Sequence, residues 1–250
     1  TRAEVEVREL DPATGRYEER AEFNPAEDET PEAYTQVKQQ DDTRYRVALA
    51  EGVTSWQVVQ ELGQIDVLDG EVEVPAEGRL APDSYEITPG TTRAELSGRL
   101  QAAQEAILAQ AWSNRVDGLP YEDPAEALIM ASIIEKETAL AEERRQVAAV
   151  FVNRLENSMR LQTDPTVIYG VTEGRGVLGR GLRRSELDRE TPYNTYRIDG
   201  LPPTPIANPG RAAIEAALDP AETDALYFVA RSLDPQDGHV FAETLAEHNE

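Results

Sequence analysis

The sequence predicts an α+β protein in which a small unit of strands and helices precedes a larger, mainly helical unit. Two observations support this fold class. Segments that alternate polar and apolar residues gather before residue 90, and a period of two is typical of half-buried strands. From residue 92 onward, apolar residues recur mainly at helical spacing. With 250 residues, the chain is long enough for one large domain or two smaller ones.

Residues 1–43 form an acidic segment that is rich in predicted strands. Glu4–Leu10 alternates polar and apolar residues, and Asn24–Tyr34 is rich in Pro and Glu. We expect edge strands around an exposed acidic loop. We find no chemistry in this segment.

Residues 44–90 predict a small α+β unit. Arg44–Leu49 alternates as a half-buried strand, and Thr54 with Gln57 forms a capping box that begins a helix ending at Gly63. Glu71–Gly78 is a second strand-like segment. The order of strand, glycine turn, capped helix and strand resembles a LysM-like module, a fold associated with N-acetylated glycans.

Residues 91–250 are predicted to be mainly helical. Thr92 with Glu95 begins a long helix, and Asp123 before Pro124 begins the next one. In that second helix, the apolar residues of 128–134 cover almost the whole circumference. We therefore expect it to lie inside a domain.

Two carboxylates, Glu135 and Glu137, interrupt the end of this apolar helix. Residues two apart lie about 200° apart around a helix axis, so both cannot face one cleft. A carboxyl group at the end of a buried helix should have a raised pKa, which suits a general acid. The other carboxylate is expected to point outward or to pair with Arg144 or Lys136. A purely structural alternative is that both charges mark where the helix reaches the surface.

A short segment after the next amphipathic helix carries several polar groups. Asp164 before Pro165 predicts a helix cap, and Gly170 predicts the end of that helix. We assign Asp164 to the cap rather than to catalysis. Gln162 and Tyr169 are polar groups in the same segment.

Thr191–Gly210 is a Pro-rich loop of unusual length for a compact domain. Its Tyr193, Asn194, Thr195 and Tyr196 suit stacking on sugar rings and hydrogen bonding to them. A rigid connector whose tyrosines anchor it to the core explains the same residues equally well.

Composition excludes several classes of function. Asp and Glu number 48 against 24 Lys and Arg, giving a net charge of -24, which opposes binding to nucleic acid or anionic membranes. The chain has no cysteine, so disulfides and thiolate sites are excluded.

His239 and His248 lack metal-site spacing, and we expect no metal and no cofactor. No apolar run reaches the ~18 residues of a membrane-spanning helix.

The central part of the sequence resembles a known family. Met130–Gly170 closely resembles the signature of the MltG (YceG-like) endolytic murein transglycosylases. Ser84 stands where the family usually has threonine. The resemblance covers roughly residues 45 to 250, is most specific from 127 to 210, and continues in the family's order through Leu80–Ile87, Pro192–Gly210, Leu226–Ala230 and Gly238–Asn249.

The resemblance implies a LysM-like subdomain over residues 44–90 and a lysozyme-like catalytic domain over residues 91–250. It implies an endolytic enzyme that cleaves the MurNAc–GlcNAc bond within nascent peptidoglycan strands, leaves 1,6-anhydro-MurNAc ends and so terminates polymerisation. The family further implies the periplasmic face of the bacterial inner membrane, a single-pass anchor preceding Thr1, and peptidoglycan synthases as partners.

The resemblance also implies which residues act. Glu137 followed by Thr138 is similar to the Glu-Ser pair of related lytic transglycosylases, which makes Glu137 the expected acid and base and leaves Glu135 as the fallback. The residues expected to hold the strand are Gln162, Tyr169, Tyr193 and Asn194.

Two other functions are kept open. The first is a muramidase that hydrolyses the same bond with Glu137 and Asp164 as its two carboxyl groups. The second is a glycan-binding scaffold without activity.

Overall fold

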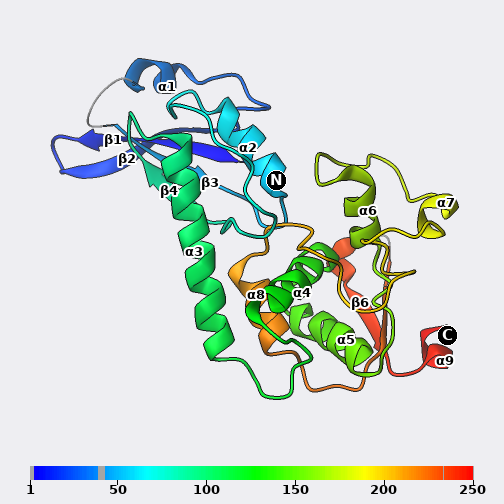
Figure 1. Ribbon diagram of the computed structural model, residues 1–250. Coiled ribbons are helices and arrows are strands. Elements are labelled where there is room, and N and C mark those ends of the chain that lie inside the picture. Colours follow the sequence, from blue (N-terminus) through cyan, green and yellow to red (C-terminus); the bar gives the residue numbers. More distant parts are fainter. Residues whose placement is uncertain (1–2, 39–42, 233, 250) are drawn as a thin grey trace.

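The computed structural model describes residues 3–38, 43–232 and 234–249. It confirms the α+β class. A four-stranded antiparallel sheet with its helices lies at one end of the molecule, and the long helix α3 (Arg93–Ser113) leads to a mainly helical unit at the other end (Figure 1).

The N-terminal sheet has the strand order β2-β1-β3-β4. β1 pairs with both β2 and β3, so the prediction that Glu4–Leu10 is an edge strand is wrong. Alternate residues of β1, such as Val5 and Val7, are fully buried and lie opposite Val47 and Tyr45 of β3. The strands are β1 (Glu4–Asp11), β2 (Arg16–Phe23), β3 (Arg44–Ala48) and β4 (Ser84–Ile87).

Helices α1 (Glu32–Val37) and α2 (Ser55–Gln64) accompany this sheet. The predicted capping box of Thr54 and Gln57 is confirmed, and α2 continues one residue past Gly63. The described structure has no strand over residues 71–78, because the alternating side chains there meet no core. Val74, for example, is 48% exposed.

One hydrophobic core joins the first hundred residues. It contains Val5 from β1, Tyr34 from α1, Tyr45 from β3, Leu62 from α2 and Leu100 from α3. Residues on both sides of position 43 therefore pack together, although they were expected to form separate segments.

The helical unit is built around α4 (Pro124–Glu137), which contacts α3, α5, α6 and α8. Every residue from 127 to 134 is buried, as the sequence predicts. The other elements are α5 (Arg144–Glu156), α6 (Asp164–Thr172), α7 (Arg184–Leu187), α8 (Arg211–Leu218), β5 (Tyr227–Ala230), η1 (Pro235–Asp237), β6 (His239–Ala242) and α9 (Leu245–His248).

The start of α4 is fixed as predicted. The Asp123 carboxylate accepts hydrogen bonds from the amides of Ala125 and Glu126 at 2.8 and 3.1 Å, and Pro124 occupies the first helical position, where no amide donor is needed. Since α4 begins at a fixed residue, its last turn delivers the Glu135–Glu137 segment to a fixed place.

The predicted bounds of α6 are wrong at both ends. Thr163, not Asp164, is the capping residue, and neither side chain caps the helix. The helix passes through Gly170 and ends at Thr172, and the capping residue that follows it, Glu173, has a φ of +53°. Gly170 is required for a different reason: a Cβ there would lie 2.9 Å from the Cβ of Tyr193.

The N-terminal unit and the helical unit meet at Asn208, which is 1% exposed. Its backbone amide donates to the Val53 carbonyl at 2.8 Å, and its carbonyl accepts from the Gly52 amide at 3.0 Å. Its side-chain oxygen accepts from the Leu80 amide at 2.9 Å. The Pro-rich loop thus extends the hydrogen bonding of the N-terminal unit.

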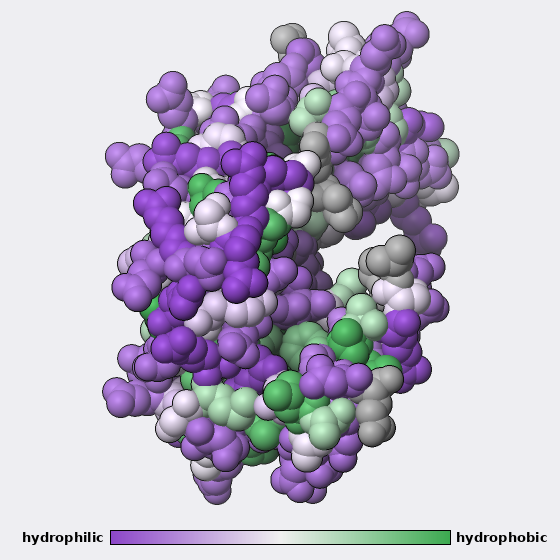
Figure 2. All heavy atoms as spheres, turned by 90° about the vertical axis from the view of Figure 1, so that its right-hand side faces the viewer, coloured by the Kyte–Doolittle hydropathy of each residue, from purple (hydrophilic) through white to green (hydrophobic). Residues whose placement is uncertain are grey.

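Hydrophilic residues cover most of the face shown in Figure 2, and hydrophobic residues gather in its lower half beside a hollow. This face is the right-hand side of Figure 1, where α6 and α7 lie. Within the described residues, no helix is both long enough and apolar enough to span a membrane.

Candidate active site

The last turn of α4 brings Glu137 to a cavity of about 200 Å³. The first turn of α6 and the segment before it form another wall, and α5 contributes a third. The lining residues are Glu137, Phe151, Arg154, Gln162, Thr163, Asp164, Tyr196 and Phe228.

Glu137 is half-buried and accepts a hydrogen bond from the hydroxyl of Thr163. Burial raises the pKa of its carboxyl group above the ordinary value, and the negative charge of Asp164 raises it further. The Thr163 hydrogen bond and the positive charge of Arg154 act in the opposite direction, and the raised pKa prevails. A larger fraction of Glu137 is therefore protonated at a given pH than for an exposed glutamate.

Arg154 is a buried cation in the same cavity, only 7% exposed. Its Nε donates to the carbonyl of Leu226 at 2.7 Å, and its Nη1 donates to the carbonyl of Leu161 at 2.6 Å. These two bonds hold the guanidinium in place. A charged residue in an amphipathic helix is expected on its polar face, but the spacing of Arg154 from Val147 and Phe151 places it on the buried face of α5.

Asp164 and Tyr196 form a pair at this cavity. The Tyr196 hydroxyl donates to Asp164 Oδ1 at 2.7 Å, and the Asp164 residue is exposed. Burial raises the pKa of Tyr196, so this tyrosine stays a hydrogen-bond donor at neutral pH. Asp164 is thus oriented by a phenol rather than by the helix that follows it.

Gln162 is the one predicted strand-holding residue that shares the cavity with Glu137. Its φ of +50° lies in the left-handed region, which costs energy for a residue with a side chain. Its backbone amide donates to the Thr195 carbonyl at 3.2 Å, and the residue is exposed. The Gln162 side chain is therefore available to a ligand.

Tyr169 and Tyr193 lie apart from Glu137. Their ring centroids are 5.0 Å apart. The Tyr169 hydroxyl donates to Glu77 at 3.2 Å, and the Tyr193 hydroxyl is 2.8 Å from that of Thr204. Tyr169 lines a neighbouring cavity of about 440 Å³, and neither tyrosine is among the residues that line the cavity of Glu137.

Asn194 is fully buried. Its side-chain amide donates to the carbonyls of Glu186, Leu187 and Arg189 at 3.2, 3.0 and 2.6 Å. These three bonds hold the segment around α7 against the Pro-rich loop. The structure thus places Asn194 where it shapes the loop, out of reach of a ligand.

Glu135 points away from this cavity, as the helical spacing predicts. Its Oε2 accepts from the Gly210 amide at 2.9 Å, just before α8. The predicted pairing with Arg144 or Lys136 is replaced by this backbone contact. Burial raises the pKa of Glu135 as well, so the raised pKa alone does not separate the two carboxylates. What distinguishes them is that Glu137 lines the cavity and Glu135 does not.

The histidines have ordinary structural partners. His239 Nδ1 lies 2.8 Å from Glu143 Oε2, and the His248 ring stacks 5.4 Å from that of Tyr227. Among the described residues, no three His, Asp or Glu side chains lie together as a metal site would require.

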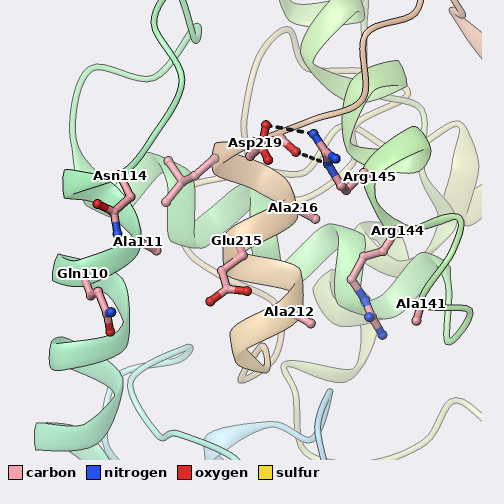
Figure 3. Close-up of a pocket in the computed structure, with 11 residues that line it drawn as sticks. Gln110, Ala111, Asn114, Ala141, Arg144, Arg145, Ala212, Glu215, Ala216 and Asp219 are labelled. Carbon is pink, nitrogen blue, oxygen red and sulfur yellow. Dashed lines mark hydrogen bonds and ion pairs between the residues drawn. The ribbon is translucent and has the colours of Figure 1, made fainter.

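A further cavity of about 470 Å³ lies between α3, α5 and α8 (Figure 3). Small alanines form much of its wall, and the Arg145–Asp219 ion pair of 2.9 Å lies at its edge. Its described lining includes none of the predicted site residues. We therefore place the candidate active site at Glu137.

Comparison with known proteins bears on this site. The sequence matches the YceG-like family over residues 11–250. It is 38% identical over 185 residues to the endolytic murein transglycosylase of Bacillus subtilis strain 168, covering 74% of this chain and 49% of the relative. It is 33% identical over 218 residues to the endolytic murein transglycosylase of Streptococcus pneumoniae D39, covering 85% of this chain and 36% of the relative.

A solved structure agrees with the fold. A YceG-like protein from Listeria monocytogenes superposes with a TM-score of 0.67 at 30% identity, covering 82% of this chain and 75% of that one. The chain spans about half or less of the length of the two curated relatives above. With a family match that extends over nearly its whole length, the chain belongs to the YceG-like family.

Proposed function

We propose that the chain is a lytic transglycosylase that cleaves the MurNAc–GlcNAc bond within murein glycan strands, with Glu137 as its acid and base. The setting of Glu137 carries this proposal, because a carboxyl group with a raised pKa faces a cavity at the end of a buried helix. General acid catalysis near neutral pH requires such a group. The relatives named endolytic murein transglycosylase support the choice of substrate.

In the first step, Glu137 donates its proton to the glycosidic oxygen while the bond from that oxygen to the anomeric carbon breaks. In the second step, the C6 hydroxyl oxygen of the same N-acetylmuramic acid attacks the anomeric carbon, and the Glu137 carboxylate accepts the hydroxyl proton. The product carries a 1,6-anhydro ring and no water is consumed. One carboxyl group therefore suffices, whereas most glycoside hydrolases use two.

The neighbouring groups support this chemistry. Arg154 is held by two carbonyls near Glu137 and stabilises the carboxylate that forms after proton donation. Exposed Gln162 contacts the sugar in the same cavity. Tyr169 contacts the strand from the neighbouring cavity, whereas Tyr193 and Asn194 act by holding Tyr169 and the loop in position.

A muramidase is the second candidate, and one observation favours it. Asp164 is exposed in the cavity of Glu137 and does not cap α6, so its carboxylate is available to activate a water molecule. In that reaction, Glu137 would protonate the leaving oxygen and Asp164 would accept a proton from the attacking water. The hydrolytic product has one more water at its reducing end than the anhydro product.

The test of the proposal is the Glu137→Gln variant, which keeps the shape of the side chain but cannot donate a proton. We expect the release of strand fragments to fall at least about 100-fold, the smallest factor typical of general acid–base catalysis. Glu135→Gln is the matched control, since its amide oxygen can still accept from Gly210, and it should keep most of its activity. Fragment release by Glu137→Gln at the native rate would refute the assignment and leave a glycan-binding scaffold as the alternative.

We further propose that residues 44–90 form a LysM-like module that binds the strand and that residues 91–250 form the catalytic domain. The antiparallel pairing of β3 with β4 on either side of α2 supports the first part. Murein as substrate places the protein outside the cytoplasm, and we extend this to the periplasmic face of the inner membrane with peptidoglycan synthases as partners.

A further inference from the structure

The cavity beside the candidate active site is the larger of the two, at about 440 Å³. It lies between the start of α2, α6 and the loop of residues 174–180. The two cavities are neighbours, because residues adjacent in the chain line them. Lys136 and Pro165 line the larger cavity, whereas Glu137 and Asp164 line the active-site cavity.

The charge of this cavity is opposite to that of the molecule. Acidic residues make up 48 of the 250 residues, so an even distribution would place about three among its fifteen lining residues. Among the described residues, its lining includes two cations, Lys136 and Arg180, and no carboxylate. Such a surface attracts an anionic ligand.

Lys136 is the cation that is free to bind such a ligand. Its Nζ donates to the Gly52 carbonyl at 3.0 Å, and an ammonium group has three donors. No carboxylate of the described residues forms an ion pair with it, whereas Arg180 is paired with Glu186 at 2.6 Å. Burial lowers the pKa of Lys136, and the negative charge of Glu135 offsets only part of this effect.

The rest of the cavity is mainly apolar. Ile168, Val177, Leu178 and Ile206 contribute aliphatic side chains, and Val177 is 85% exposed. The loop is rich in glycine, and a Cβ placed on Gly176 would meet no atom within 4 Å, which leaves room for a ligand close to the backbone. An apolar surface with one cation suits a short peptide that has small aliphatic side chains and a carboxylate.

We propose that this cavity binds the peptide substituent of the glycan strand, with a carboxylate of the peptide on Lys136. The inference rests on the proposed function, because the N-acetylmuramic acid of murein carries a short acidic peptide on its lactyl group. A sugar bound beside Glu137 directs that peptide across the last turn of α4 into the neighbouring cavity. The enzyme therefore prefers strands that carry peptides over strands without them.

The test compares cleavage of peptide-bearing strands with cleavage of the same strands after an amidase has removed the peptides. We expect the wild-type protein to cleave peptide-bearing strands about tenfold faster, the effect of one charge-assisted hydrogen bond. Lys136→Met should abolish this preference and leave the rate on peptide-free strands unchanged. Lys136→Arg should restore it. The matched control is Lys38→Met, since Lys38 is the other lysine of the chain and pairs with Asp66.

Two results would overturn the inference. One is that the wild-type protein cleaves the two substrates at equal rates. The other is that Lys136→Met lowers the cleavage rate equally on both substrates, which would mean that Lys136 maintains the structure of the active site and does not bind the peptide. If no strand is cleaved, the proposed function fails, and binding decides the inference separately. By calorimetry, N-acetylmuramoyl-L-alanyl-D-glutamate should then bind about tenfold more weakly to Lys136→Met than to the wild type. Equal affinity, or no binding to the wild type, would refute it.

Discussion

Glu135 and Glu137 have different surroundings although they are two residues apart on one helix. Helical geometry predicted that they face opposite sides, and the structure confirms it, with Glu135 at the Gly210 amide and Glu137 at the Thr163 hydroxyl. The sequence alone could not show which side holds a cavity. That side is built by α5 and α6, whose packing depends on contacts between residues far apart in the chain.

The raised pKa of Glu137 predicts an effect on stability. Folding raises the pKa above its unfolded value, so the folded state holds the proton more tightly, and wild-type stability falls as the pH rises from the unfolded pKa of about 4.3 through the folded one. Glu137→Gln has no such loss. We therefore expect the variant to have a higher Tm than the wild type near pH 7.

Thermal unfolding at several pH values tests this prediction. The advantage of Glu137→Gln should shrink as the pH falls from the raised folded-state pKa of Glu137 toward about 4, because the folded and the unfolded wild type are then both protonated at this residue. A Tm difference that is the same at pH 4 and pH 8 would contradict it.

Arg154 and Asn194 show where sequence patterns fall short for single side chains. An arginine in an amphipathic helix is assumed to face solvent, yet Arg154 is buried, and the carbonyls of Leu161 and Leu226 accept hydrogen bonds from its guanidinium. An asparagine in a loop with tyrosines suits sugar binding, yet three carbonyls enclose Asn194. In both cases the partners come from segments whose positions no local pattern specifies.

Ser132 connects α4 to the Pro-rich loop. Its hydroxyl donates to the Ile129 carbonyl at 2.7 Å and accepts from the Ile206 amide at 3.0 Å. Ser132 is fully buried, so no water can replace it in these bonds. The hydroxyl therefore holds the loop against the helix that carries Glu137.

Ser132→Ala should lower the free energy of unfolding by about 1–3 kcal/mol, because the buried Ile206 amide loses its acceptor. Ser113→Ala is the control on an exposed serine and should change this free energy by less than about 0.5 kcal/mol. Urea unfolding monitored by circular dichroism measures both. Equal midpoints for the two variants would show that the Ser132 hydroxyl contributes nothing.

Helix starts were predicted best, because each depends on a few adjacent residues. The caps at Thr54, Thr92 and Asp123 are all confirmed. The errors occurred where contacts between distant residues determine the structure. Residues 71–78 alternate but face no core, and α6 continues through Gly170, whose missing Cβ leaves room for Tyr193. Sheet order, which makes β1 a central strand, likewise depends on long-range pairing.

Asn208 couples the two ends of the molecule. It is bonded to Gly52, Val53 and Leu80, all in the N-terminal unit, while the neighbouring Ile206 packs in the helical core. The fold class was predictable from periodicity, whereas this junction was not, because a buried asparagine in a Pro-rich loop has no distinctive pattern.

Asn208→Ala should lower the free energy of unfolding by about 1–3 kcal/mol, because the Leu80 amide loses its acceptor, and should separate the unfolding of the two cores. Single-tryptophan forms monitor each core, since Trp56 lies on α2 and Trp112 lies against the helical core. Their fluorescence transitions in urea should coincide with Asn208 present and diverge in Asn208→Ala. Coincident transitions at an unchanged midpoint would contradict the coupling.

The central claim is that a single carboxyl group, Glu137, cleaves murein strands without water. Digestion of purified glycan strands by the wild-type protein, followed by mass spectrometry of the fragments, tests it most directly. We predict fragments that end in 1,6-anhydro-N-acetylmuramic acid, with no water added. Fragments that each carry one added water at the reducing end would contradict this account and identify a hydrolase, with Asp164 as the second carboxyl group.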